Sequence, residues 1–165
     1  MNHANSISKE VAYNFLSKIP LAVFGTVSNQ NEPHLTTLFY VIDSDLNFYF
    51  ITRSNTTKVN NIKRGSNVSI VVSDRRSFTT IEAHGIAIQL SGVDKIKIIF
   101  KMFTDVYRNQ DIIEKGKLFN WAPPISNVEK GDIVIYEVKP DWIRYANYEN
   151  TSPLDNNAMQ EVILE

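Results

Sequence analysis

Apolar and polar positions alternate with a period of two through much of the chain, which is the pattern of half-buried strands. Leu46, Phe48 and Phe50, for example, fall on one face of a single run. The short polar turns between the runs favour antiparallel pairing. We expect strands at Leu21–Ser28, Pro33–Ile42, Leu46–Thr52, Val68–Ser73, Phe78–Leu90, Ile133–Val138 and Trp142–Tyr145.

Three segments have helical spacing instead: Ser8–Lys18, Ser54–Arg64 and Ser91–Asn109. The second has Ser54 or Asn55 as its expected N-cap, and Val59 and Ile62 as its inward face. The third carries a continuous apolar stripe, made of Ile96, Ile99, Phe100, Phe103, Val106 and Tyr107. About seven strands and three helices predict a small, mainly antiparallel barrel with helices packed outside it.

Two local features refine this plan. Gly85 interrupts the longest predicted strand, which indicates a bulge or a barrel corner. From Asn147 onward the composition becomes polar. We expect one domain over residues 1–147 and a polar C-terminal tail over residues 148–165, loosely held or dependent on a partner.

The amino-acid composition excludes several classes of function. The 165 residues include no cysteine, which excludes disulfide scaffolds, cysteine–zinc modules, iron–sulfur clusters and thiol catalysis. The net charge of −1 argues against a nucleic-acid partner held by bulk positive charge. No run approaches the roughly 20 apolar residues that span a bilayer, and no secretory signal begins the sequence. A cytoplasmic protein without nucleic-acid or membrane partners is therefore expected.

Few residues suggest catalysis by side chains alone. The three histidines, His3, His34 and His84, lack a second ligand at metal-binding spacing, so no metal site is expected. No nucleophile motif is present, and no residue is assigned as a catalytic acid or base. With no cysteine, redox chemistry would need an organic cofactor.

One turn has the chemistry of a phosphate site. The segment from Thr52 to Lys58 runs from a strand end into a helix N-terminus, where backbone N–H groups and the helix dipole favour an anion. Arg53 and Lys58 would supply charge, and Thr57 a hydroxyl donor. A capped surface helix with incidental charges is the competing interpretation.

The order of the segments resembles the pyridoxamine 5′-phosphate oxidase-like family of FMN-binding split barrels. The resemblance lies in LAVFGTVSNQNEPHLTTLFYVID, LNFYFITRSNTTKVNNIKRGSNVSIVV and TTIEAHGIAIQL. It extends from Ile7 to Asn147 and rests on the ordered set, since no single motif is specific. It implies a six- to seven-stranded antiparallel split barrel with peripheral helices.

The resemblance also implies FMN at the interface of a homodimer. Carried over by position, one strand lines the isoalloxazine ring, a second ends beside the ribityl phosphate, and the following helix holds the phosphate. Thr80 matches a position that contacts the flavin of the partner subunit. The residues implied on the first three segments are Thr36, Thr37, Leu38, Ile51, Thr52, Thr57 and Lys58.

Departures from the family concern the substrate. Pyridoxamine phosphate oxidases look to have arginine at the positions of Thr36 and Thr57. The C-terminal segment here also lacks the Arg-x-His pair that would contact the substrate phosphate. These differences argue against vitamin B6 oxidation and favour the short general stress protein and uncharacterised FMN-binding branches. In those branches a long helix and a loop, here Trp121 to Pro124, replace the substrate arm. Trp121 or Trp142 could then reach the partner's flavin.

The leading hypothesis is a homodimeric FMN-dependent oxidoreductase that acts on an unknown small molecule. One alternative is a non-enzymatic flavin-binding module for storage, sensing or stress response. Another is the same barrel with deazaflavin or haem, for which His34 or His84 would be the axial ligand.

Overall fold

Strands form most of the protein in the computed structural model, which describes residues 6–63, 65, 67–109, 125–149, 151, 155 and 158–164. The strands are β1 (Ser6–Ile7), β2 (Leu21–Val27), β3 (Pro33–Phe39), β4 (Val41–Ile42), β5 (Phe48–Arg53), β6 (Asn67–Asp74), β7 (Thr79–Gln89), β8 (Ile133–Asn147) and β9 (Met159–Val162). The helices are α1 (Lys9–Leu16), α2 (Thr57–Ile62), α3 (Val93–Asn109) and α4 (Ile125–Glu129).

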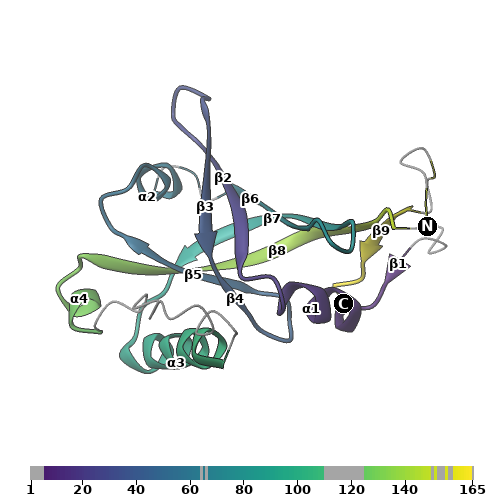
Figure 1. Ribbon diagram of the computed structural model, residues 1–165. Helices are drawn as coiled ribbons and strands as arrows, with labels where there is room; N and C mark the ends of the chain where they lie inside the picture. The colour runs from purple at the N-terminus through teal and green to yellow at the C-terminus, as the bar shows by residue number, and fades with distance from the viewer. Residues whose placement is uncertain are drawn as a thin grey trace.

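The strands belong to one sheet that curls around a core without closing. The order is β1-β9-β8-β7-β6-β2-β3, and β5 pairs with β8 and with β4. In Figure 1, β2, β3 and β6 cross over β5 and the long β7–β8 pair, while the helices lie outside. This arrangement confirms the predicted mainly-β split barrel with peripheral helices. The described residues contain nine strands where seven were predicted: β1 and β9 were not expected, one predicted strand is divided into β3 and β4, and two predicted strands join as β8.

Alternation of side chains builds the core. Ala22, Phe24 and Thr26 of β2 are buried, whereas the residues between them face outward. Phe50 lies at the centre of the barrel, with its ring 4.6 Å from that of Phe24 and 5.4 Å from that of Tyr136. The barrel therefore has a solid aromatic interior with no room for a cofactor among these rings.

A second core lies between α3 and the outside of β4, β5 and β8. Ile99, Phe100 and Phe103 of α3 are buried there against Tyr49 and Ile135. These three residues belong to the predicted apolar stripe, which is thus confirmed where side chains are described. The stripe fixes α3 against the sheet through hydrophobic burial.

A polar contact also lies inside this second core. The Tyr49 hydroxyl is 2.8 Å from Asp43 Oδ2 and 2.9 Å from Glu137 Oε1. Burial, reinforced by hydrogen bonds to the two carboxyl groups, raises the pKa of the Tyr49 hydroxyl far above its usual range. The hydroxyl therefore keeps its proton and joins the β4–β5 turn to β8.

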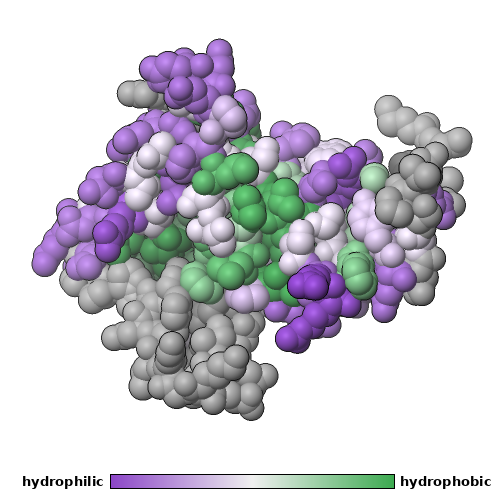
Figure 2. Space-filling view, turned by 45° about the horizontal axis from the view of Figure 1, so that its top comes forward, coloured by the Kyte–Doolittle hydropathy of each residue, from purple (hydrophilic) through white to green (hydrophobic). Residues whose placement is uncertain are grey.

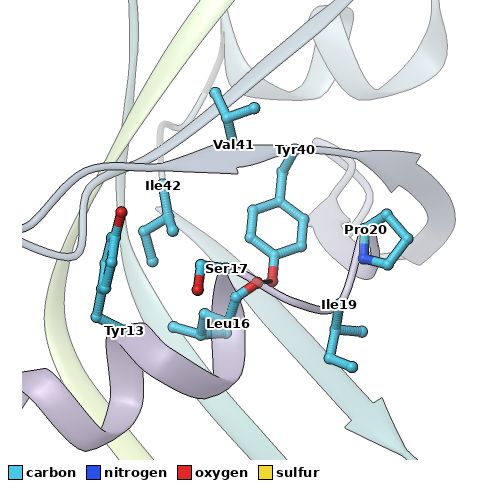
Figure 3. Close-up of a pocket in the computed structure, with 8 residues that line it drawn as sticks. All are labelled: Tyr13, Leu16, Ser17, Ile19, Pro20, Tyr40, Val41 and Ile42. Carbon is cyan, nitrogen blue, oxygen red and sulfur yellow. Dashed lines mark hydrogen bonds between the residues drawn. The ribbon is translucent and has the colours of Figure 1, made fainter. Parts of the chain in front are cut away.

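The segment predicted as one strand, Pro33–Ile42, is divided at Tyr40 into β3 and β4. The Tyr40 hydroxyl donates a hydrogen bond of 2.7 Å to the carbonyl of Leu16, near the end of α1, as Figure 3 shows. The same carbonyl accepts the backbone N–H of Ile19, at 3.3 Å, so two donors meet at the end of the helix. The adjoining cavity, of about 50 Å³, is too small for a cofactor.

The segments predicted as two strands, Ile133–Val138 and Trp142–Tyr145, form one continuous strand, β8. Pro140 lies inside it, although proline has no N–H for a ladder. It is tolerated because β5 pairs only as far as Val138 and β9 only from Arg144, so β7 is the sole neighbour there in the described sheet.

Gly85 confirms the predicted bulge. The β7–β8 register shifts between His84 and Gly85, so that Asp141 is the extra residue. A Cβ atom on Gly85 would lie 2.1 Å from the carbonyl oxygen of Lys139 and 2.7 Å from Cα of Pro140. Only glycine permits this approach of two backbones.

The expectation of a loosely held C-terminal end is wrong for Met159–Val162. These residues form β9, which pairs antiparallel with β8 and parallel with β1. Val162 is buried, and Trp142 Nε1 donates a hydrogen bond of 3.1 Å to Glu161 Oε1. The polar composition of the residues before β9 led to the incorrect prediction.

We predict that Gly85→Ala destabilises the protein by about 3 kcal/mol or more, because the new methyl group meets backbone atoms that cannot rotate away. Chemical denaturation would measure the loss. Gly65→Ala is the matched control, since nothing lies within 4 Å of its added Cβ. Equal stability of the two variants would contradict this account of the bulge.

Candidate functional site

The end of β5 and the start of α2 come together as the sequence predicts. Lys58 Nζ lies 3.2 Å from Thr52 Oγ1, so it can donate a hydrogen bond across the turn. Ile51 and Thr52 are half-buried, while Arg53 and Thr57 are exposed. The turn therefore presents two cationic side chains and two hydroxyl groups on one short stretch.

Packing of α2 holds this turn in place. Val59 and Ile62 are buried in the main core, as predicted. Asn61 Nδ2 donates a hydrogen bond of 3.0 Å to Thr26 Oγ1, and both groups are buried. This contact ties α2 to β2 and so fixes the position of Lys58.

The predicted helix start is wrong by a few residues. α2 begins at Thr57, with Thr56 rather than Ser54 or Asn55 as its N-cap, and the Thr56 side chain makes no cap hydrogen bond. Its hydroxyl instead donates to the carbonyl of Arg53, at 3.2 Å. Because α2 has only six residues, charge on Lys58 and Arg53 is the main attraction for an anion here.

Lys58 is the most distinctive charge of the turn. Burial lowers the pKa of its amine below the ordinary value, since the charged form loses hydration. None of the ion pairs formed by the described residues involves Lys58. An anion bound beside it would restore that lost stabilisation.

β3 supplies the third predicted segment. It contacts both α2 and β5, which places Thr36, Thr37 and Leu38 on a strand next to the turn. Thr36 is half-buried, Thr37 is exposed, and Leu38 packs partly against the core. The three segments assigned to one site thus adjoin one another in the fold.

His34 is a feature of this region that the sequence did not reveal as part of it. It lies on β3 opposite Thr26, the residue that anchors α2. Its Nδ1 atom is buried without a hydrogen-bond partner, which is unusual for a buried polar atom. A bound polar ligand would give this nitrogen a partner, so the region fits a cofactor that carries polar groups.

Thr80 lies far from this turn within one chain. Thr52 pairs with Val134 of β8, whereas Thr80 pairs with Ala146, twelve residues further along the same strand. Twelve residues of strand extend roughly 40 Å. Within one chain, Thr80 is therefore not brought to the β5–α2 turn. Trp121, the remaining predicted residue, lies outside the described residues.

The outer face of the sheet is unusually apolar. Figure 2 shows hydrophobic surface gathered in the middle of one face of the molecule, bordered by hydrophilic residues. Seven exposed hydrophobic side chains point outward from β2, β3, β6 and β7: Leu21, Val23, Val27, Leu35, Val71, Ile86 and Ile88. Leu35 is 70% exposed. A surface of this kind indicates an interaction site.

A polar and aromatic cluster borders this face on β7 and β8. His84 Nδ1 is hydrogen-bonded to Asp141 Oδ1, and the His84 ring stacks on Trp142 with centroids 4.9 Å apart. Arg144 lies over the same tryptophan ring and pairs with Glu82. The bulge at Gly85 brings Asp141 to His84, so this cluster depends on the irregular register.

The described residues also lack two kinds of feature. They contain no group of three or more His, Asp and Glu side chains arranged to hold a metal ion. None of their helices is both long and apolar enough to cross a membrane.

Comparisons with known proteins place these features in context. The family model described as "Pyridoxamine 5'-phosphate oxidase" matches residues 8–147. The search of curated proteins gave no match.

Solved structures share the fold at low sequence identity. A conserved hypothetical protein from Mycobacterium tuberculosis is 17% identical, with a TM-score of 0.67 and coverage of 87% of this chain and 86% of that one. A protein related to general stress protein 26, from Clostridium acetobutylicum, is 12% identical, with a TM-score of 0.63 and coverage of 86% and 89%. HutZ, the haem storage protein of Vibrio cholerae, is 12% identical, with a TM-score of 0.57 and coverage of 82% and 92%.

Proposed function

This chain belongs to the pyridoxamine 5′-phosphate oxidase family, and we propose that it is a homodimeric FMN-binding oxidoreductase acting on a small molecule. The observation that carries the proposal is the contact between Lys58 and Thr52, at the turn that the family resemblance assigns to the FMN phosphate. When bound, FMN would supply the redox chemistry, and the protein would hold and orient it.

The chain's own residues have distinct tasks in this proposal. Lys58 and Arg53 bind the phosphate dianion, with Thr52 and Thr57 as hydroxyl donors. Thr36, Thr37 and Leu38 line the isoalloxazine ring, and Ile51 lies with Thr52 beside the ribityl phosphate. The unpartnered His34 Nδ1 is available for a polar group of the same cofactor. No side chain is assigned as a catalytic acid or base.

Two separate features support the proposed homodimer. Thr80 is roughly 40 Å from Thr52 along β8 of its own chain, so a complete site needs a partner's Thr80. The exposed apolar face of β2, β3, β6 and β7 offers a hydrophobic surface that a second copy of the chain could cover in a two-fold dimer. The charged and aromatic cluster around Trp142 would then lie at its polar rim.

Haem is a second candidate, favoured by the His84–Asp141 contact. A histidine that ligates a metal usually donates its other ring nitrogen to a carboxylate, and His84 does so while its side chain is exposed. The adjoining apolar face could cover a porphyrin. HutZ of Vibrio cholerae, a haem storage protein, shares the fold. On this alternative the protein would bind or store a cofactor without turnover.

Lys58→Met is expected to weaken FMN binding about 10- to 100-fold, the loss of about 1.5–3 kcal/mol that a charge-assisted hydrogen bond contributes. Fluorescence titration with FMN would measure it, and Lys63→Met, on an exposed residue at the end of the same helix, is the control. Mass spectrometry of material released by denaturation would identify the natural cofactor. Unchanged affinity in Lys58→Met would place the phosphate elsewhere.

The same variant should not be less stable than the wild type. Because the folded-state pKa of Lys58 lies below 10.5, the folded protein holds this proton less tightly than the unfolded chain, and stability rises with pH up to about that value. Lys58→Met removes the cost, so its free energy of unfolding should equal or exceed the wild-type value at neutral pH. The advantage should shrink at alkaline pH.

Leu35→Glu is expected to convert the dimer into a folded monomer, because it places a charge at the most exposed hydrophobic residue of the proposed interface without disturbing the core. Analytical ultracentrifugation and circular dichroism would separate dissociation from unfolding. Ile98→Glu, at a 59% exposed position on α3, is the control. A monomeric wild type, or a dimeric Leu35→Glu variant, would contradict the proposed dimer.

If haem is the ligand, titration of the purified protein gives a Soret band that His84→Ala abolishes and His34→Ala leaves intact. Asp141→Asn should weaken haem binding about 10- to 100-fold, since the carboxylate orients the ring. A band that persists in His84→Ala would exclude this histidine as the axial ligand.

A further inference from the structure

Phe78, in the turn between β6 and β7, has an unusual conformation and an unusual exposure. Its φ angle is +48°, in the left-handed region that bulky residues rarely adopt, and its side chain is 60% exposed. Such a backbone costs about 1–3 kcal/mol, and an exposed ring recovers little by burial. Folding stability alone does not account for a phenylalanine here.

The turn is nevertheless well ordered. Asp74 accepts hydrogen bonds from the backbone N–H groups of Arg76 and Ser77 and from the Ser77 hydroxyl. The carbonyl of Phe78 accepts a hydrogen bond of 3.0 Å from the backbone N–H of Tyr148. These contacts hold the strained residue in one conformation, so its ring is presented from a fixed backbone.

Phe78 borders an open hollow of about 340 Å³, within the size range of small-molecule sites. Asp74, Arg75, Thr80 and Tyr148 are among the residues that line the same hollow. Two aromatic side chains, one cationic side chain and one carboxylate thus border it. Because the carboxylate of the neighbouring Asp74 is engaged by its own turn, and no ion pair of the described residues includes Arg75, the guanidinium is available to a ligand.

The hydroxyl groups of the hollow have a defined direction. Thr80 Oγ1 donates to the carbonyl of Val72, at 3.2 Å, so the contact between Ser73 Oγ and Thr80 Oγ1 has Ser73 as its donor. Both hydroxyl protons are therefore in use. Arg75 is left as the main donor for an anionic group, while the aromatic rings favour a flat apolar body.

We propose that this hollow binds a planar aromatic anion, held by Arg75 through its negative group and by Phe78 and Tyr148 through its ring. Its role as a substrate site rests on the proposed function, because Thr80 is the residue that the family resemblance assigns to the flavin of the partner subunit. The hollow would then lie beside that flavin and select aromatic carboxylates and related anions as the substrate class.

The test uses 2-naphthoate, a fluorescent planar carboxylate, with the neutral 2-naphthamide as its charge control. We expect 2-naphthoate to bind the purified protein more tightly than 2-naphthamide. Arg75→Gln should weaken 2-naphthoate binding about tenfold or more and leave 2-naphthamide almost unaffected. Arg76→Gln, the same charge change at the next residue of the turn, is the matched control and should bind normally.

Phe78→Gly distinguishes a binding role from a structural one. Glycine relieves the positive φ, so thermal stability should stay equal or rise, while affinity for both naphthalene probes should fall at least several-fold. The proposal is overturned if 2-naphthoate fails to bind at millimolar concentration, or binds Arg75→Gln and Phe78→Gly as tightly as the wild type.

Parallel FMN titrations separate this proposal from the proposed function. Arg75-dependent binding of 2-naphthoate in a protein that does not take up FMN would support the hollow and refute the flavin site. Normal FMN binding without any response to 2-naphthoate would refute the hollow alone.

Discussion

The approach of two backbones at Gly85 is the constraint on which the rest of the structure depends. Because glycine has no side chain there, the Lys139 carbonyl can pass close to β7, and β8 continues through Pro140 without a break. One long strand then holds β5 by its first half and β9 by its second half. The same shift in register brings Asp141 to His84.

The length of β8 also determines how a site can be assembled. It separates the β5–α2 turn from Thr80 by a distance that no side chain can cross. A barrel of this kind can fold as a single chain and still lack half of its proposed binding site. The exposed apolar face and the divided site point to the same proposed arrangement, in which each copy completes the site of the other.

The sequence was sufficient to predict the features that depend on neighbouring residues. The strand alternation, the bulge at Gly85 and the closeness of Thr52 to Lys58 were predicted correctly, because each follows from residue types a few positions apart. The continuity of β8 and the presence of β9 were not predicted, since both depend on distant partners. Proline in a strand is acceptable only where one side has no neighbour. β9 forms because β1 and β8 flank it. The hollow beside Phe78 could not be predicted from the sequence, because a positive φ angle at phenylalanine depends on tertiary contacts.

Lys58 and Phe78 both lower the free energy of unfolding. Lys58 is partly desolvated, and Phe78 combines a strained backbone with an exposed ring. They lie at opposite ends of the sheet, one at the β5–α2 turn and the other beside Thr80. Residues that cost stability and also border candidate binding regions fit the general trade-off between stability and function.

The parallel pairing of β1 with β9 has a consequence for the order of folding. Ser6 pairs with Glu161, so this contact closes a loop of 155 residues. During synthesis, β1 has no partner until Glu161 and Val162 have been made. The rest of the barrel does not depend on this contact, so the edge of the sheet is the part whose formation carries the largest loop-closure cost.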